Sequence, residues 1–209
     1  ESVSLHNPIH DYVQRELNKR FKEFSSFRDI SIYSSTFNVN GQCFDGDITE
    51  WIFPASHYKI EKSYDLVFIG FQEIVELTAG QMVNTNSGNL TIWEKKIKQC
   101  LNDKFQNVKY ITHWSGQIGG MALILFVKEV EIKHISNIES AFKKTGLGGM
   151  SSNKGGIGVS FNYSNTNFCF VSSHLAAGLN NVDERHQNYK TIFKGIKFSK
   201  NRRIKDHDV

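Results

Sequence analysis

Residues 145–174 read TGLGGMSSNKGGIGVSFNYSNTNFCFVSSH, and the other segments of the chain are best understood by their relation to this one. The pattern predicts a glycine-rich loop with one lysine, a strand that leaves the loop, and a second strand that ends on His174. Small residues in Ser151–Gly156 let backbone N–H groups approach an anion, and Lys154 adds a positive charge there. A strand ending on His174 can bring an imidazole to the same place. We therefore expect an enzyme domain that handles phosphate.

Length and composition indicate a folded globular protein. The chain has 209 residues, of which 39% are hydrophobic and 22% charged, a balance that argues against disorder. The sixteen Phe residues support a sizeable core, and the length suits one large domain or two small ones. The longest clean apolar run, Met121–Val127, is too short to span a membrane, and the first residues show no signal segment.

Charge and cysteine usage bear on partners and compartment. The net charge is +4, but the segment Arg185–Val209 alone holds eight Lys/Arg and two Asp/Glu, which leaves the rest of the chain slightly acidic. Such a basic end favours anionic lipid surfaces or nucleic acid, or it is simply a solvated helix face. Cys43, Cys100 and Cys169 are far apart, which suits free thiols in a reducing, cytoplasmic compartment.

Three amphipathic helices are predicted from apolar residues at helical spacing. The first begins at Asn7-Pro8, a good cap and first turn, and should pack into the core through Ile9, Tyr12, Val13, Leu17, Phe21 and Phe24. Asn89 should cap the second, whose inner face is Leu90, Trp93, Ile97, Leu101 and Phe105. Asn181 and Glu184 form an expected capping pair for the third, which continues through Tyr189, Ile192, Phe193 and Ile196.

Two predicted strands end in polar side chains. Asp29–Asn40 reads as a strand, and alternation places Asn38 and Asn40 on one side if it continues unbroken; the alternative is a turn at these residues. Asp65–Phe71 is a nearly continuous apolar run, typical of a strand covered on both faces, and it leads directly to Glu73. A carboxylate at such a place needs a partner, and either a metal cation or an arginine would serve.

The remaining strands are expected at 108–114, 119–128 and 130–134, followed by a short polar stretch that can be helical. A strand pair follows at 156–163 and 167–174, in which Phe168, Phe170, Ser172 and His174 share a face. A histidine at a strand end is more often structural than catalytic, so its position alone does not assign a role. Because strands and helices alternate, the fold class is α/β or α+β.

Common nucleotide, hydrolase and zinc motifs do not match. Lys154 lies between Asn153 and Gly155, which excludes a Walker loop, and Ser151 stands where a dinucleotide fingerprint needs Gly or Ala. G-x-S-x-G, H-E-x-x-H and zinc-like Cys/His spacings do not occur. What remains is a set of oxygen donors that suits Mg²⁺ better than zinc, formed by Asn38, Asn40 and Glu73.

Five short blocks occur in one order along the chain: Phe37-Asn-Val-Asn-Gly-Gln42, Gly70-Phe-Gln-Glu73, Gly119-Gly-Met-Ala122, Ser152-Asn-Lys-Gly-Gly156 and Ser173-His-Leu-Ala176. In this order they resemble the inositol polyphosphate 5-phosphatase family, most closely the catalytic domain of synaptojanin-type phosphoinositide 5-phosphatases. The resemblance implies a DNase I-like endonuclease/exonuclease/phosphatase fold, with two sheets packed face to face and helices outside.

The resemblance also implies an activity and roles for matching residues. The reaction would be Mg²⁺-dependent hydrolysis of the 5-phosphate of phosphoinositides such as phosphatidylinositol 4,5-bisphosphate. Glu73 would bind the metal with Asn38 beside it and Asn40 as a further ligand, and His174 would contact the scissile phosphate. Asn153 and Lys154 would bind the 1-phosphate of the inositol head group, which places the bilayer near this loop and the protein peripherally at membranes.

Two positions depart from the family pattern. Phe37 stands where the family usually has Trp, a change in packing that should leave the neighbouring amides in place. Where the family tends to read E-R-N-x-D-Y, residues 184–189 read E-R-H-Q-N-Y. Arg185 therefore matches and Asn188 replaces an Asp, and both are expected to support substrate binding in roles that the resemblance leaves open.

The family pattern continues with a G-D-x-N-Y-R block and an S-D-H-x-P-V block, which carry the water-orienting Asp and the residues that sense the 4-phosphate. Neither occurs before Val209, and Lys205 precedes Asp206-His207 where the later block has Ser. Residues 1–209 are thus expected to form the N-terminal part of one 5-phosphatase catalytic domain, with little or no turnover alone. Such a truncated sandwich should expose the inner face of a sheet and favour self-association.

Two other functions fit parts of the pattern. A nuclease of the same fold group would use similar metal chemistry, but the Asn-Lys-Gly-Gly block and the match along the whole chain favour inositides, so no nucleic-acid partner is expected. A non-catalytic module that binds head groups or membranes is permitted by the basic end and by the missing blocks.

Overall fold

The computed structural model describes residues 7–54, 63–76 and 87–209, and the chain divides into two units, residues 1–30 and 31–209. In the first unit, Asn7 begins α1 (Pro8–Lys19) as expected, because its side-chain oxygen accepts the N–H groups of Ile9 and His10. A short α2 (Phe21–Phe24) follows. Neither helix has a residue buried within its own unit, and packing of this apolar stripe into the core stays a prediction.

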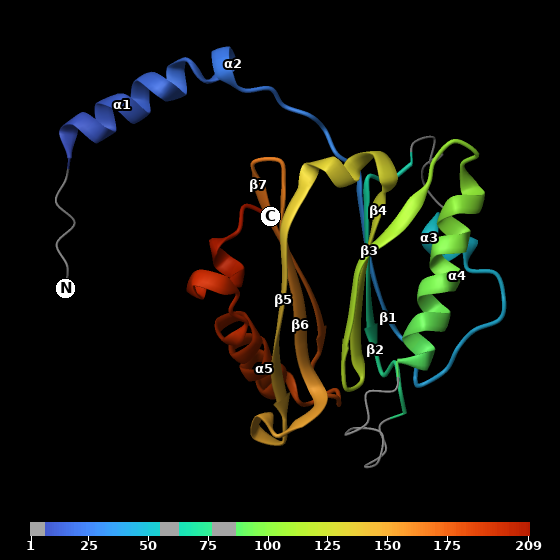
Figure 1. The fold of residues 1–209 in the computed structure, drawn as a ribbon. Helices are drawn as coiled ribbons and strands as arrows, with labels where there is room; N and C mark the ends of the chain where they lie inside the picture. Colours follow the sequence, from blue (N-terminus) through green and yellow to red (C-terminus); the bar gives the residue numbers. More distant parts are fainter. Residues whose placement is uncertain (1–6, 55–62, 77–86) are drawn as a thin grey trace. The chain divides into compact units, whose positions relative to one another are not determined.

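The second unit contains two β-sheets (Figure 1). Sheet A has the order β1-β2-β4-β3, in which β1 and β2 are parallel and the other neighbours antiparallel. Its strands are β1 (Ile32–Asn38), β2 (Leu66–Gln72), β3 (Tyr110–Ile118) and β4 (Met121–Lys128). Every residue of β2 is buried, as its continuous apolar run predicts for a strand covered on both faces.

Helices α3 (Thr49–Ile52) and α4 (Gly88–Lys104) cover the outer face of sheet A. The expected inner face of α4 is confirmed, since it shares a core with alternate side chains of β2 and β4 through Leu90, Trp93, Ile97 and Leu101. Asn89 is not the cap of this helix. Ser87 holds that position, and the Asn89 amide donates to the carbonyls of Gly41 and Ile74 at 2.9 Å each.

Sheet B is antiparallel, in the order β5-β6-β7, with strands β5 (Ile135–Gly146), β6 (Ser151–Tyr163) and β7 (Thr166–His174). Its outer face is covered by α5 (Val182–Gly195), whose Ile192 lies directly over Gly156. The chain then passes through two short 3₁₀ helices, η3 (Ser199–Asn201) and η4 (Ile204–Asp206), and the carbonyl of Val209 accepts the N–H of Cys169 at 2.8 Å. All three cysteines are free.

Three local expectations are corrected by sheet B. Residues expected as a strand at 130–134 form the 3₁₀ helix η1 (Glu129–His134), and the polar stretch after it is the edge strand β5. The segment Ser151–Gly156 is not a loop but the beginning of β6, in which Gly155 and Gly156 pair with both β5 and β7. The turn lies earlier, at η2 (Leu147–Gly149), where Gly148 and Gly149 adopt the left-handed backbone that glycine tolerates best.

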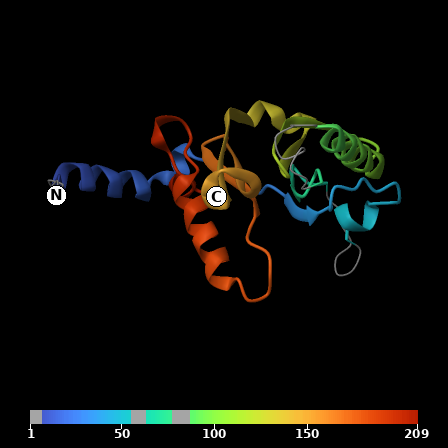
Figure 2. The same cartoon turned by 90° about the horizontal axis from the view of Figure 1, so that it is seen from below.

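The two sheets pack face to face, as the view from below also shows (Figure 2). Phe68 of β2 stacks on Phe161 of β6, with ring centroids 5.9 Å apart. One close approach is between Gly70 and Ser172, because a Cβ atom on Gly70 would lie 2.5 Å from the Ser172 hydroxyl. This approach brings together β2 and β7, the strands that lead to Glu73 and His174.

Candidate active site

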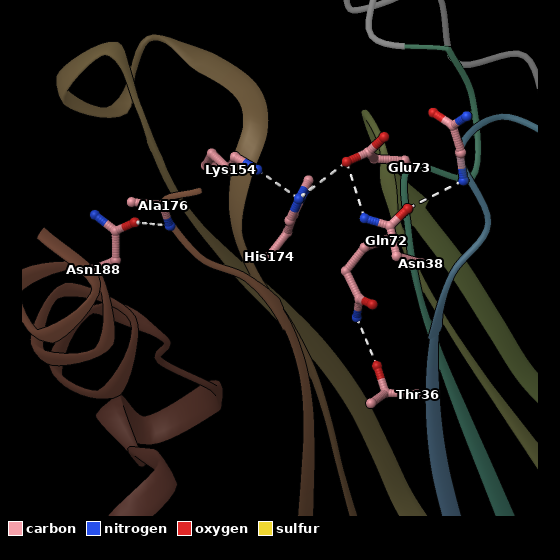
Figure 3. Close-up of polar contacts among 9 residues, drawn as sticks. Thr36, Asn38, Gln72, Glu73, Lys154, His174, Ala176 and Asn188 are labelled. Carbon is pink, nitrogen blue, oxygen red and sulfur yellow. Dashed lines mark hydrogen bonds and ion pairs between the residues drawn. The ribbon is translucent and has the colours of Figure 1, made fainter. Parts of the chain in front are cut away.

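Polar side chains from both sheets meet at one end of the sandwich (Figure 3). Asn38 pairs with Gln72 in the parallel register of β1 and β2. Asn38 and Glu73, the residue after Gln72, therefore lie at the same end of these two strands. In sheet B, His174 pairs with Gly155, which places it beside Lys154. The predicted convergence of Asn38, Glu73 and His174 is therefore observed.

Glu73 is held by the amide of Asn38. The Asn38 Nδ2 atom donates to Glu73 Oε1 at 2.9 Å, and its Oδ1 accepts the backbone N–H of Asn40 at 3.1 Å. The strand ends at Asn38 and Asn40 has a φ of 48°, so of the two alternatives for these amides the turn is the one observed. Asn40 instead contacts the site through its main chain.

The imidazole of His174 lies between Glu73 and Lys154. Its Nε2 atom is 3.5 Å from Glu73 Oε1 and 2.5 Å from Lys154 Nζ. A lysine ammonium can only donate, so Nε2 accepts and the imidazole is neutral in this arrangement. Burial is the main cause that lowers the pKa of His174, and the charge of Lys154 lowers it further, while Glu73 opposes both. Burial likewise lowers the pKa of Lys154.

Gln72 links the strands that carry these groups, a role that the sequence pattern does not predict. Its Nε2 atom donates to Thr36 Oγ1 of β1 at 2.7 Å and lies 3.5 Å from Ser172 Oγ of β7. The Gln72 side chain of β2 thus contacts β1 in its own sheet and β7 in the other sheet. The available signal was an amide at the end of an otherwise apolar strand.

Asn153 faces the turn before β6. Its Oδ1 atom is buried, has no hydrogen-bond partner among the described residues, and lies against Gly146, where a Cβ atom would clash with it. Its backbone N–H donates to Ser151 Oγ at 3.4 Å. Binding of a phosphate by Asn153 stays a prediction, and the orphaned oxygen is a hydrogen-bond acceptor, which a phosphate would not satisfy.

Arg185 and Asn188 both support the segment that follows His174. The Arg185 guanidinium donates to the carbonyl oxygens of Gly178 at 2.5 Å and Leu179 at 3.3 Å. Asn188 is buried, and its Oδ1 accepts the N–H of Ala176 at 3.0 Å. Because this role needs only an acceptor, Asn188 can replace the Asp of the family pattern here. Their contact with substrate stays a prediction.

The donor chemistry of this end suits a hard divalent cation. Glu73 supplies a carboxylate whose side chain is 23% exposed, and Asn38 supplies an amide oxygen. The Asn38 NH₂ group now faces Glu73, so ligation through Oδ1 requires the amide to rotate. Among the described residues no three His, Cys, Asp or Glu side chains gather, so water and substrate oxygens would complete the coordination, as is common for Mg²⁺.

Within the part of the chain that the structure describes, no helix has the length and apolar composition needed to cross a membrane.

Comparison with known proteins identifies relatives along nearly the whole chain. Residues 35–209 match the model of Endonuclease/Exonuclease/phosphatase family 2. The chain is 49% identical to the phosphatidylinositol 4,5-bisphosphate 5-phosphatase INP51 of Saccharomyces cerevisiae over 99% of its length, which covers 22% of that protein. It is 31% identical to human synaptojanin-2, covering 94% of this chain and 14% of the relative. The chain thus spans about a fifth or less of these relatives' own length.

A solved structure agrees with the fold. The crystal structure of the inositol polyphosphate 5-phosphatase domain of SPsynaptojanin, in complex with inositol (1,4)-bisphosphate and calcium ion, matches with a TM-score of 0.84 and 39% identity. The match covers 97% of this chain and 57% of that one. The fold, the converging strand ends and these relatives lead to one conclusion: the chain belongs to the inositol polyphosphate 5-phosphatases of the endonuclease/exonuclease/phosphatase family, in the part of the catalytic domain shared with synaptojanin and INP51.

Proposed function

We propose that residues 1–209 are the N-terminal part of a catalytic domain that removes the 5-phosphate from phosphoinositides such as phosphatidylinositol 4,5-bisphosphate, with Mg²⁺ as cofactor. The observation that carries this proposal is the convergence of His174, Lys154 and Glu73 within hydrogen-bond or ion-pair distance. A cation, an imidazole and a carboxylate at one place can bind a phosphate and a divalent ion together.

Lys154 and His174 would bind phosphate oxygens in this scheme. A phosphate that enters takes the ammonium as its partner, which frees Nε2 of His174 to donate once it carries a proton. Since both side chains are partly or fully buried, their attraction to a phosphate is stronger than it would be in water. Glu73 and Asn38 would hold Mg²⁺, which supplies neutralisation of charge on the phosphoryl and leaving oxygens.

Membrane proximity follows from the same arrangement. The 1-phosphate joins an inositol ring to its diacylglycerol, so a substrate held there by Lys154 has its lipid chains close to the preceding turn. That turn carries Leu147 and Met150, whose exposed fractions are 74% and 82%. Apolar side chains at this position support a protein that works at a bilayer surface.

The relatives support the substrate class. INP51 is named for phosphatidylinositol 4,5-bisphosphate, and the SPsynaptojanin domain holds inositol (1,4)-bisphosphate with a calcium ion. A divalent ion and a head group in a domain 39% identical to this chain fit the donor set around Glu73.

Calorimetric titration of the pure chain with inositol 1,4-bisphosphate, in the presence of Mg²⁺, tests the proposal. We expect Lys154→Ala to weaken binding by about tenfold or more, since it removes a charge-assisted contact. Lys190→Ala, an exposed lysine on α5, is the matched control and should bind as the parent chain does. Equal affinity of Lys154→Ala and the parent chain would refute the assigned pocket.

Catalysis is tested separately. Phosphate release from phosphatidylinositol 4,5-bisphosphate should be a trace at most for residues 1–209, and should be substantial when the complete domain is used. Cleavage of DNA by the complete domain, with inositides untouched, would favour the nuclease alternative. Head-group binding with no release by the complete domain would favour the non-catalytic module.

A further inference from the structure

The segment between His174 and α5, residues 175–181, is held in a fixed conformation; we call it the post-histidine loop. Asn188 accepts the N–H of Ala176, and Arg185 donates to the carbonyls of Gly178 and Leu179. Asn181 Nδ2 donates to the carbonyl of Ala177 at 2.7 Å. Three consecutive carbonyls, those of Ala177, Gly178 and Leu179, thus accept hydrogen bonds from side chains, which hold the exposed part of the loop in place.

This anchored loop presents an apolar side chain to the outside. Leu179 is 94% exposed, the largest exposed fraction among the large hydrophobic residues that the structure describes. Val182, at the start of α5, is 48% exposed. An exposed leucine alone is common on protein surfaces, so it is the position of Leu179, on a loop held by side-chain hydrogen bonds beside the candidate site, that bears on its role.

The loop lies at the same end of sheet B as the candidate site. Since β6 and β7 are antiparallel and Gly155 pairs with His174, the loop leaves the sheet beside Lys154. The η2 turn leaves the same end, and both connections are found at the bottom of Figure 1 and face the viewer in Figure 2. The site therefore lies beside two connections that carry exposed apolar side chains.

We infer that Leu179 inserts into the lipid bilayer that contains the substrate, with the post-histidine loop as a preformed support. The inference rests on the proposed function, because a membrane is close to this end only if the substrate is a lipid. The nearby charges do not favour anionic lipid, since Asp183 and Glu184 follow directly and Arg185 is occupied by carbonyls. Insertion of Leu179 is thus an apolar effect, independent of salt and of lipid charge.

Sedimentation with vesicles tests this contact, using phosphatidylcholine alone and phosphatidylcholine with phosphatidylserine. We expect Leu179→Ser to weaken partitioning by about tenfold, the effect of withdrawing one leucine from an apolar phase. The factor should be the same for both lipid compositions and at low and high salt. Val130→Ser is the matched control, because Val130 is 64% exposed but precedes β5, at the opposite end of sheet B. It should change nothing.

The outcomes distinguish membrane contact through Leu179 from head-group binding at the site around Lys154. Leu179→Ser should bind soluble inositol 1,4-bisphosphate as the parent chain does, since the side chain points away from the protein. Unchanged partitioning of Leu179→Ser, or no vesicle binding by the parent chain, overturns the inference. A loss confined to phosphatidylserine vesicles at low salt also overturns it. If the parent chain partitions through Leu179 but does not bind inositol 1,4-bisphosphate, the proposed function fails and the membrane contact stands.

Discussion

The imidazole of His174 is the residue on which the environment of the site acts most directly. It is buried beside an ammonium on one side and a carboxylate on the other. Burial and the ammonium both disfavour the imidazolium and lower the pKa of His174, while Glu73 and the Asn153 backbone favour it. Since Lys154 contributes one of the two unfavourable effects, the protonation of His174 depends on a residue of a different strand.

We expect an NMR titration of His174 to give a midpoint below the ordinary value of 6.5, because its pKa is lowered. Lys154→Met should raise the midpoint by removing the neighbouring charge, and Lys190→Met should leave it unchanged. Because the pKa of His174 is lowered by folding, the unfolded parent chain binds the imidazole proton more tightly than the folded chain does. The free energy of unfolding should therefore fall as the pH is lowered from 6.5 towards the folded midpoint. A midpoint above 6.5 would contradict the described contacts.

At the scale of elements, strands with continuous apolar runs and helices with clear periodicity could be predicted from the sequence, as β2, β4 and α4 illustrate. The strand β5 and the beginning of β6 could not. β5 is an edge strand with mixed polar side chains, so it lacks the apolar alternation that marks a strand. Gly155 and Gly156 look like loop residues in the sequence, but they lie inside β6. Glycine is required there because the Lys143 carbonyl and the Ile192 side chain leave no room for a side chain.

The candidate site shows the same division. Asn38, Glu73 and His174 end recognisable strands, so their convergence could be expected. The bridge from Gln72 to Ser172 joins residues 100 positions apart in two sheets, and no local pattern marks such a pair. Arg185 and Asn188 matched a family motif, but which atoms they contact depends on how the post-histidine loop folds back onto α5.

The hydrogen bond between Asn188 of α5 and the post-histidine loop predicts that two substitutions of Asn188 differ in their effect on stability. Asn188→Ala should lower the free energy of unfolding by about 1–3 kcal/mol, because the buried N–H of Ala176 loses its acceptor. Asn188→Asp should lose less, since a carboxylate also accepts. Urea denaturation measures both. An alanine variant as stable as the parent chain would show that this hydrogen bond does not support the loop.

At the scale of the whole unit 31–209, the cleft between the sheets is open beside β1 and β7. It has a volume of about 500 Å³ and is lined by hydroxyl groups as well as aromatic rings, with Ser34, Thr36, Ser172, Phe68 and Phe170 among its residues. The expected exposed face is therefore less apolar than a core cut in half, which favours weak rather than obligate self-association.

Sedimentation equilibrium should detect weak self-association through the cleft as an average mass that rises with protein concentration. Ser34→Asp, which adds a charge inside the cleft, should shift the rise to higher concentration. Ser136→Asp is the control, because Ser136 is exposed on β5, in the other sheet. A constant monomer mass at all concentrations would count against association through this cleft.

The near contact of Gly70 with Ser172 has a consequence for how such a site can vary. Glu73 lies three residues after one member of this pair, and His174 two residues after the other. The spacing of the two layers at this point therefore sets the separation of acid and imidazole. A substitution far away that thickens the sandwich would disable the pair while leaving every reactive atom chemically intact.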